Sequence, residues 1–313
     1  MTDPNVPGAA PAPAEAPSPT RTARVVALIL NWNGAAILDP CVASVSRSRA
    51  VALHTVVVDN GSTDESASRA AASHPGVEVL ALGSNLGYAR GMNRGIAHAL
   101  ALGAEYLLFL NNDATVEPDC VARLAAVLDA DPTIGMVGPK VLFDTDPTLI
   151  QYAGGRISRW TGRSRSIGLG EHDGPRFAKP CDVDFVSGCC LLVRATAIER
   201  AGPLDERFFH GYEDVEWNLR VKRAGYRVRF EPSARAHHGH ARSSGGYDSP
   251  FYVYYQVRNR FLLVRRITTP MQRLAWLPFQ VAHIARRGLD LLRAGALDAL
   301  PAFARGGGWD RGT

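Results

Sequence analysis

The stretch TVVVDNGSTDES, residues 55–66, decides the fold, because an apolar β-branched run passes directly into a polar turn and then into a helix-forming segment. The stretch RVVALILNWNG, residues 24–34, has the same form, and residues 35–46 after it have helical composition. Two strand–loop–helix units in immediate succession predict parallel βαβ winding.

Strands and helices continue to alternate along the chain. We expect strands at 77–82, 106–110, 185–193 and 226–230, and helices at 88–102, 117–128, 196–201 and 213–224. The spacing of apolar residues in these segments supports the assignments. The sequence therefore predicts an α/β fold of Rossmann-like form, with a mostly parallel central sheet, flanking helices and a C-terminal helical appendage.

The composition divides the 313 residues into three regions. Residues 1–22 are rich in Pro and Ala and predict a flexible tail, residues 23–248 hold the α/β domain, and residues 249–313 are basic. From residue 251 onwards there are ten Arg and three Asp, a local charge of +7 that leaves −2 for the rest of the chain.

The basic C-terminal region indicates which partners to expect. Its positive charge and apolar residues fit binding to an anionic membrane surface. The alternative is that it forms a helix hairpin, packed on the α/β domain or on a second copy in a homo-oligomer. No RNA- or DNA-binding motif accompanies the charge, so nucleic acid is not an expected partner.

Several features favour a cytoplasmic location. The apolar runs are shorter than the roughly 20 residues that cross a bilayer, and residues 1–20 lack the apolar core of a secretory signal. The five cysteines show neither a disulfide framework nor metal-ligand spacing. We therefore expect a cytoplasmic protein with reduced thiols, whose basic end can reach the inner face of the cell membrane.

In open α/β sheets the ligand binds beyond the carboxyl ends of the strands, and the polar clusters of this chain gather there. Asp113 follows the strand at 106–110, where a carboxylate can hold a hard divalent cation. The alternative is an Asx turn before the next helix. Asp59 follows the second strand and can accept hydrogen bonds from a pyrimidine or a ribose, while the alternative is a turn that caps the next helix.

The stretch SNLGYARGMNRG, residues 84–95, suits an anionic diphosphate. Asn85 and Gly87 precede a helix start whose backbone N–H groups favour anions, and Arg90 and Asn93 follow in the helix. The spacing matches neither a Walker loop nor a dinucleotide fingerprint. An ordinary helix punctuated by Gly is the alternative.

The stretch YEDVEW, residues 212–217, combines acids with an aromatic ring. Glu213 and Asp214 stand at a helix start, and Trp217 shares a helix face with Asp214. A carboxylate beside an aromatic ring predicts a sugar site, in which Asp214 accepts the proton of an acceptor hydroxyl. Capping of the helix is the alternative for the acids.

Three histidines, His237, His238 and His240, follow the last expected strand. Neutral imidazoles can complete a metal site with Asp113. The alternative is that they are surface residues of a loop.

Taken in order, seven motifs resemble family 2 of the inverting glycosyltransferases, and within it the bacterial rhamnosyltransferase and galactofuranosyltransferase group. They are NWNG, VVVDNGSTD, NLGYARGMNRG, FLNNDA, SGCCLLVRA, GPLDERFFHGYEDVEWNLRVKRAGYRV and HHGHARSS, within residues 24–265. The resemblance implies a GT-A fold, a nucleotide-sugar donor such as a UDP- or dTDP-sugar, and Mn²⁺ or Mg²⁺ as cofactor. It also implies a glycan or polyprenyl-linked acceptor in cell-wall or surface polysaccharide synthesis.

The resemblance assigns roles to three acids. Asp59 contacts the base, Asp113 binds the metal, and Asp214 is the general base of an inverting transfer. Asn111 replaces the first acid of the family's DXD-like triplet, which makes a ligand from His237, His238 or His240 more necessary. The expected substrate-binding residues are Asn33, Asp59, Asn85, Gly87, Arg90, Asn93, Asn112, Glu213 and Trp217.

Two other functions compete with this one. A sugar-1-phosphate nucleotidyltransferase also binds nucleotide and metal on an α/β sheet, but its Gly-rich N-terminal loop with Arg and Lys is missing here. A scaffold could instead bind glycan or partner subunits without catalysis, although the three acids argue against that alternative.

Overall fold

The computed structural model describes residues 24–158, 160–239, 249–293 and 297–307. The predicted tail at residues 1–22 lies outside the described residues, and so does His240. The strands are β1 (Arg24–Asn31), β2 (Ala52–Asp59), β3 (Val77–Ala81), β4 (Tyr106–Asn111), β5 (Ala114–Val116), β6 (Ile134–Phe143), β7 (Ile150–Tyr152), β8 (Gly155–Ile157), β9 (Ser164–Ser166), β10 (Cys181–Asp182), β11 (Cys190–Arg194) and β12 (Arg227–His238).

The central sheet runs in the order β10-β12-β6-β11-β4-β1-β2-β3, with β5 beside β12 and β7 beside β6. β3, β2, β1 and β4 are parallel, β12 is parallel to β6, and β11 is antiparallel to both of its neighbours. The predicted α/β fold is therefore confirmed, with a mixed sheet. β8 and β9 pair with each other in a separate hairpin.

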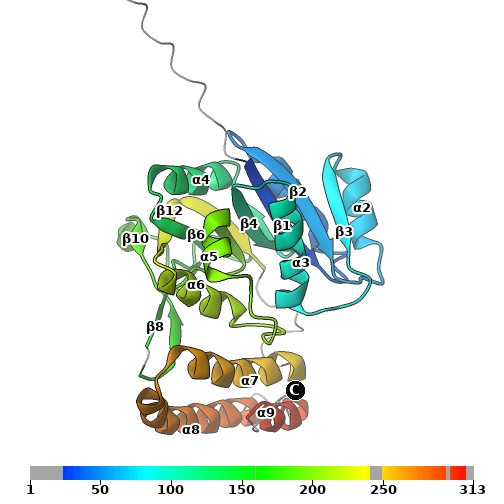
Figure 1. Cartoon of the computed structure of the whole chain (residues 1–313). Coiled ribbons are helices and arrows are strands. Elements are labelled where there is room, and N and C mark those ends of the chain that lie inside the picture. Colours follow the sequence, from blue (N-terminus) through cyan, green and yellow to red (C-terminus); the bar gives the residue numbers. More distant parts are fainter. Residues whose placement is uncertain (1–23, 159, 240–248, 294–296, 308–313) are drawn as a thin grey trace, which may run out of the picture.

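Helices cover both faces of the sheet, which explains why its strands read as continuous apolar runs. In β1, Val25 and Ile29 belong to the core on one face, and Val26 and Leu28 to the core on the other. The first face carries α1 (Leu38–Ser46), α2 (Ser66–Ser73) and α4 (Cys120–Ala130), and the second carries α3 (Tyr88–Ala101), α5 (Ala195–Ala201) and α6 (Glu213–Arg223) (Figure 1).

The last strand is longer than the sequence predicted. β12 begins as expected, passes an irregularity between Glu231 and Arg235, and continues to His238 beside β6 and β5. Glu231, Pro232 and Ser233 interrupt the apolar pattern after Phe230, so the sequence does not show that the strand continues. The extension places His238 next to Ala114.

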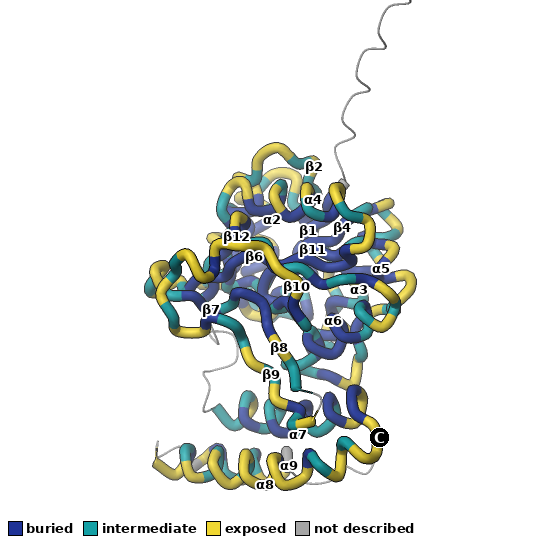
Figure 2. Tube along the Cα trace, turned by 90° about the vertical axis from the view of Figure 1, so that its left-hand side faces the viewer, coloured by how far each residue is buried: buried dark blue, intermediate teal, exposed yellow. Residues whose placement is uncertain are grey.

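The C-terminal region forms the predicted helical appendage. It consists of α7 (Pro250–Ile267), α8 (Pro270–Arg293) and α9 (Leu300–Gly307), with a short 3₁₀ turn at Leu297–Ala299. A second 3₁₀ turn, Pro175–Phe177, lies in the α/β domain. α7 packs on the α/β domain through Leu263 and Ile267, which share a core with Phe208, Val215 and Leu219. α8 lies on the far side of α7 and is largely exposed (Figures 1 and 2). Within the described residues, we find no helix whose length and apolarity would let it span a membrane.

Candidate active site

A cavity of about 610 Å³ opens where β1 and β4 end, at the edge that the sequence predicted. Seven residues proposed from the sequence line this cavity. They are Asn85, Gly87, Asn112, Asp113, Glu213, Asp214 and His238. Six other proposed residues, all in the described part of the chain, are not among those that line it. They are Asn33, Asp59, Arg90, Asn93, Trp217 and His237.

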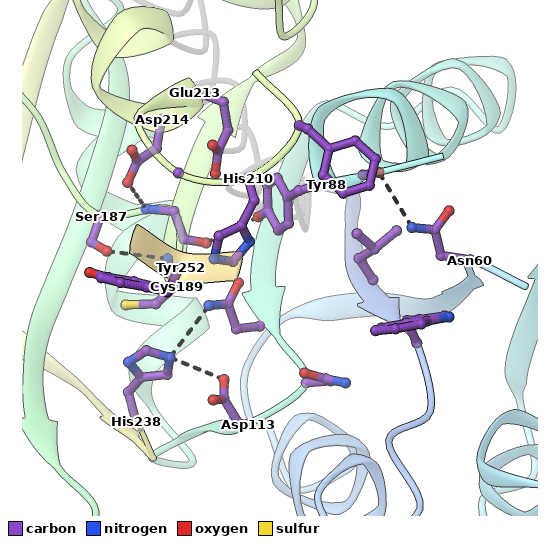
Figure 3. Close-up of a pocket in the computed structure, with 18 of the residues that line it drawn as sticks. Asn60, Tyr88, Asp113, Ser187, Cys189, His210, Glu213, Asp214, His238 and Tyr252 are labelled. Atoms are coloured by element: carbon purple, nitrogen blue, oxygen red, sulfur yellow. Dashed lines mark hydrogen bonds and ion pairs between the residues drawn. The ribbon is translucent and has the colours of Figure 1, made fainter. Parts of the chain in front are cut away.

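Asp113 and His238 meet on one wall of the cavity (Figure 3). Nε2 of His238 lies 3.0 Å from Oδ1 of Asp113, and both side chains are almost fully buried. On the other side of the ring, Nδ1 lies 2.7 Å from Oε1 of Gln151. Because an amide oxygen only accepts, Nδ1 donates this hydrogen bond, and Nε2 is the ring nitrogen that faces Asp113.

This pair fits a divalent cation. A metal-binding histidine usually donates its second ring N–H to an oxygen, as His238 does to Gln151. Groups of three or more His, Cys, Asp or Glu that could hold a metal do not occur among the described residues. Asp113 and His238 would thus be two protein ligands of an ion whose other positions are taken by water and phosphate, as Mg²⁺ sites often are.

His237 faces the other side of β12. Its Nε2 lies 3.6 Å from Oε1 of Glu117. Successive side chains of a strand point to opposite faces, so His237 and His238 cannot both reach one cavity. The prediction that His237 is a metal ligand is therefore wrong.

Glu213 and Asp214 stand at the start of α6, across the cavity from Asp113 and His238 (Figure 3). Oδ2 of Asp214 accepts a hydrogen bond of 2.8 Å from the N–H of Gly188, and Oδ1 accepts one of 2.7 Å from the N–H of Val215. Burial raises the pKa of Asp214 above its ordinary value, and these two donors oppose the rise.

Glu213 has a different environment from its neighbour. Its Oε2 is buried, with no hydrogen-bond partner among the described residues. Burial, and then the charge of Asp214, raise the pKa of Glu213 to about 8. At neutral pH Glu213 therefore keeps its proton.

Gly188 approaches Asp214 more closely than a larger residue could. A Cβ at this position would lie 3.1 Å from Cβ of Asp214 and 3.4 Å from its Oδ2. Gly188 belongs to the SGCC motif, residues 187–190, whose start precedes β11 and lines the cavity. Burial raises the pKa of the Cys189 thiol to about 12, so this cysteine is protonated and unsuited to act as a nucleophile.

Asn60 organises the loops near Asn85 and Gly87. Its Oδ1 accepts a hydrogen bond of 3.0 Å from the N–H of Leu86, and its Nδ2 donates to Oδ1 of Asn85 and to the carbonyl of Gly87. Gly87 has a φ of +80°, and a Cβ there would lie 2.5 Å from the ring of Phe209. The conformation of this wall therefore requires glycine.

Asp59 and Asn33 hold the neighbouring loops together. Asp59 accepts hydrogen bonds from the N–H and hydroxyl of Ser62, and Asn33 accepts one of 2.8 Å from the N–H of Thr63. Asn112 lines the cavity and donates to Oδ1 of Asn31. A contact of Asp59 with a nucleoside remains a prediction.

Arg90 and Asn93 are occupied elsewhere. Nε of Arg90 donates to Glu206 at 2.9 Å, and Asn93 exchanges two hydrogen bonds of 2.9 Å with the backbone of Leu204. Both residues anchor the segment before the acid pair instead of lining the large cavity. Arg90 also lines a smaller pocket of about 400 Å³ nearby.

Trp217 belongs to the core, so the prediction that it faces a sugar is wrong. Its side chain is 1% exposed, its ring lies 5.1 Å from that of Phe109, and Nε1 donates to the carbonyl of Gly202 at 2.8 Å. The helix face that carries Trp217 is the face that α6 packs on the sheet.

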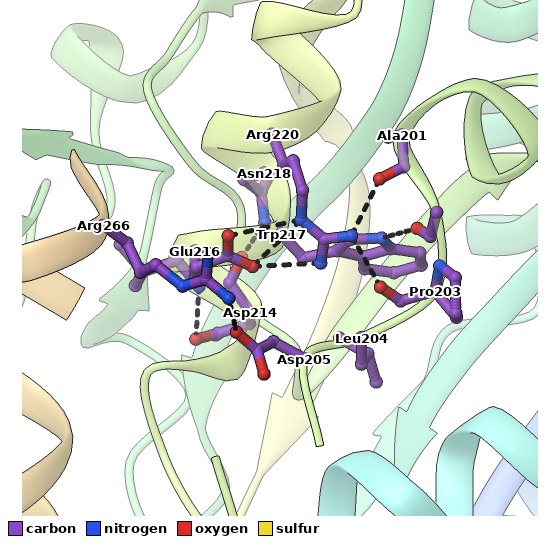
Figure 4. A network of polar contacts seen from close by, with 12 residues as sticks. Ala201, Pro203, Leu204, Asp205, Asp214, Glu216, Trp217, Asn218, Arg220 and Arg266 are labelled. Atoms are coloured by element: carbon purple, nitrogen blue, oxygen red, sulfur yellow. Dashed lines mark hydrogen bonds and ion pairs between the residues drawn. The ribbon is translucent and has the colours of Figure 1, made fainter. Parts of the chain in front are cut away.

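A polar network beside Trp217 holds α6 in place (Figure 4). Arg220 pairs with Glu216 at 2.9 Å and donates to the carbonyls of Ala201 and Pro203 at 2.7 Å. Arg266 of α7 pairs with Asp205 at 2.7 Å. α6 is thus tied to the segment that precedes it, and Asp205 of that segment is tied to the appendage.

Sequence reasoning missed several residues of the cavity wall. They are Leu30, Trp32, Asn60, Asn111, Tyr88, Tyr152, Ser187, Gly188, Cys189, Phe209, His210, Gly211, Phe251 and Tyr252. His210 and Ser187 stand in quoted motifs, which could have indicated them. Phe251 and Tyr252 belong to α7, and nothing in the sequence indicates that α7 closes the cavity.

The model of the family described as glycosyl transferase family 2 matches residues 27–202, more than half of the chain. The chain belongs to glycosyl transferase family 2. The resemblance inferred from the motifs is confirmed, and this glycosyltransferase also has curated relatives that are rhamnosyltransferases.

Two such relatives are of similar length to this glycosyltransferase. The N-acetylglucosaminyl-diphospho-decaprenol L-rhamnosyltransferase of Mycobacterium tuberculosis (strain ATCC 25618 / H37Rv) is 29% identical over 233 residues, which cover 66% of this chain and 73% of that one. The dTDP-rhamnosyl transferase RfbF of Shigella flexneri is 30% identical over 225 residues, which cover 70% of this chain and 73% of that one.

A solved structure supports the fold of this glycosyltransferase. The mannosyltransferase PcManGT from Pyrobaculum calidifontis, in complex with GDP-Man and Mn²⁺, aligns with a TM-score of 0.60 over 95% of this chain and 90% of that one. The sequence identity is 20%. The predicted GT-A fold is thereby confirmed.

Proposed function

We propose that this glycosyltransferase is inverting and assisted by a divalent cation, and that it moves a sugar from a dTDP- or UDP-sugar to a hydroxyl of a glycan or lipid-linked acceptor. One observation carries the proposal: Asp214 lines the same cavity as Asp113 and His238, on the opposite wall (Figure 3). A sugar between these walls would have a base on one side and its leaving group on the other.

Asp214 is the proposed general base. Its carboxylate, held by the N–H groups of Gly188 and Val215, would accept the proton of the incoming hydroxyl as that oxygen attacks the anomeric carbon. The attack comes from the face opposite the leaving diphosphate, so the configuration inverts. The raised pKa of Asp214 makes it a stronger base than an exposed aspartate.

Glu213 is proposed to bind substrate in its protonated form. Its buried carboxyl group faces the cavity (Figure 3), and with a pKa of about 8 it can donate a hydrogen bond to a sugar oxygen at neutral pH. With Glu213 protonated, the acid pair would carry a single negative charge, that of Asp214, next to the reacting hydroxyl.

Asp113 and His238 are the proposed ligands of Mn²⁺ or Mg²⁺. The bound cation would neutralise charge on the leaving diphosphate. Asn85, Gly87 and Asn112 line the same cavity and are proposed to contact the donor. Asp59, which lies one residue before Asn60, is proposed to contact the nucleoside.

The relatives guide the choice of substrates to test. The name of the Shigella flexneri relative specifies dTDP-rhamnose chemistry, and that of the Mycobacterium tuberculosis relative specifies a diphospho-decaprenol acceptor. We propose dTDP-rhamnose as the first donor and a polyprenyl-diphosphate-linked sugar as the first acceptor. We also propose that residues 23–248 form the catalytic domain and residues 249–313 a C-terminal region that completes the cavity.

Donor binding and stereochemistry test the proposal. A thermal-shift screen of dTDP-, UDP- and GDP-sugars, each with and without Mn²⁺, should show one donor that stabilises the protein more when Mn²⁺ is present. NMR of the product should show an anomeric configuration opposite to that of the donor. Retention of configuration, or donor binding indifferent to Mn²⁺ and Mg²⁺, would contradict the proposal.

A further inference from the structure

Exposed residues recur along the whole length of α8 (Figure 2), and several of them have large apolar side chains. On one face of the helix, exposed large apolar side chains recur every three or four residues. Ala285 fills the one wider gap between them. Each of them is at least 52% exposed, and Met271 reaches 79%. We call them the outer face of α8: Met271, Leu274, Leu277, Val281, Leu289 and Leu292.

The opposite face of α8 is the one that packs on the protein. Trp276 lies edge-to-face on Phe261 of α7, with ring centroids 5.2 Å apart. Gln280 accepts a hydrogen bond of 2.7 Å from Nε of Arg260, and the buried Leu291 shares a small core with Val253. The outer face is therefore not needed to hold α8 on α7.

Exposed large apolar residues are concentrated in α8. Of the eleven exposed large apolar residues in the described part of the chain, seven lie in α8. Scattered apolar side chains are ordinary on a protein surface, but a continuous patch marks a site of interaction. The outer face thus needs a partner.

The charge around the outer face selects the partner. Residues 250–293 contain eight Arg, no Lys or Glu, and Asp290 as the sole acid. Arg286 and Arg293 are exposed on α8 itself, whereas Arg273 donates hydrogen bonds to the carbonyls of Arg265 and Thr268. A second copy docked about a two-fold axis would place the same basic patch on both sides of the contact, and the like charges would repel each other. An anionic surface would instead be attracted by them.

We propose that the outer face of α8 docks on an anionic lipid bilayer, with the helix lying in the plane of the interface. The apolar side chains enter the boundary between headgroups and acyl chains, and the flanking arginines contact the headgroup phosphates. The helix lies on the membrane and does not cross it.

This orientation deepens the proposed function, on which the next step rests. α7 lies between α8 and the catalytic domain (Figure 1), and Phe251 and Tyr252 of α7 line the cavity. Docking would hold the cavity one helix layer, about 10 Å, above the interface. A lipid-linked acceptor could then reach Asp214 with its lipid still in the membrane.

Vesicle flotation of the full chain tests the docking. The probes are vesicles of phosphatidylcholine alone and vesicles with added phosphatidylglycerol. We expect the protein to float with the anionic vesicles, and the bound fraction to fall as salt rises. Replacing Leu274→Ser, Val281→Ser and Leu289→Ser together should weaken partitioning by about tenfold or more.

Two further variants sharpen the result. Leu169→Ser is the matched control, because Leu169 is 55% exposed but lies in the α/β domain, and it should float like the wild type. Replacing Arg286→Gln and Arg293→Gln together should weaken the preference for anionic vesicles. All these side chains are exposed, so the variants should keep the melting temperature of the wild type.

Three results would overturn the proposal. The wild type could fail to float with anionic vesicles, the triple serine variant could float as well as the wild type, or ultracentrifugation could show a dimer that the triple serine variant converts to a monomer. The last result would make a second copy the occupant of the outer face. Flotation requires no turnover, so failure of the proposed transfer reaction would leave this test unaffected.

Discussion

Nε2 of His238 lies 3.0 Å from Oδ1 of Asp113, although the two residues are distant in the sequence. The contact exists because β12 continues past its irregularity and pairs with β5, which sets His238 opposite Ala114. Asp113 directly precedes Ala114, so a strand register creates the proposed metal site.

His238→Ala should lower transfer activity by about 100-fold at limiting Mn²⁺, because it removes one of two proposed protein ligands. The measurement is kcat/KM as a function of Mn²⁺ concentration, and added Mn²⁺ should recover part of the activity. His237→Ala is the matched control, since His237 faces Glu117. Equal losses in the two variants would contradict the assignment.

Asp214→Asn should reduce kcat by about 10²- to 10⁴-fold, because an amide cannot accept the proton of the acceptor. Donor affinity, measured by thermal shift, should stay close to that of the wild type. Glu213→Gln provides the comparison, since an amide can still donate a hydrogen bond as the protonated acid does. It should retain activity within about tenfold of the wild type, and undiminished turnover in Asp214→Asn would reject the proposed base.

Glu213 should make the folded protein less stable as pH rises from 4.5 to about 8. In this window the carboxyl group is ionised in the unfolded chain but protonated in the folded protein, whose pKa is about 8. The unfolded state therefore binds fewer protons, so the free energy of unfolding falls with rising pH. Below pH 4.5 both states are protonated and this loss is absent.

Melting curves of Glu213→Gln test whether Glu213 makes the stability fall as pH rises. The variant cannot ionise, so its melting temperature relative to the wild type should be a few degrees higher at pH 8 than at pH 5. A difference that is constant across this range would mean that Glu213 is already ionised in the folded protein.

Trp217→Leu should destabilise the fold by about 2–4 kcal/mol, because it leaves a cavity beside Phe109 and removes the hydrogen bond to Gly202. The acceptor KM of the folded fraction should not change. Phe251→Ala should behave in the opposite way, since Phe251 lines the cavity and is 43% exposed. Denaturant unfolding and steady-state kinetics of both variants distinguish a core residue from a binding residue.

The strand and helix pattern made much of the fold predictable. Runs such as Val25–Leu30 are apolar because helices cover both faces of the sheet, and each run ends where polar residues begin. The antiparallel direction of β11 could not be predicted from the sequence, since a short buried strand has the same apolar pattern in either direction.

Side-chain direction was predicted less well than location. Asp113, Glu213 and Asp214 line the cavity as expected, because polar residues just beyond strand ends or at helix starts cannot easily be buried in the core. Trp217, Arg90 and Asn93 share helices with site residues, yet they point to the core or to the segment at 204–206. The sequence does not show which part of a helix face meets the cavity.

The sequence by itself determined the family, the α/β architecture and the acids of the candidate site, because local apolar patterns and motif order are properties of the chain alone. The tertiary structure decided that His238 and not His237 joins Asp113, that α7 closes the cavity, and that α8 keeps an apolar face exposed. These features depend on strand register and helix docking, which arise from contacts between segments far apart in the chain.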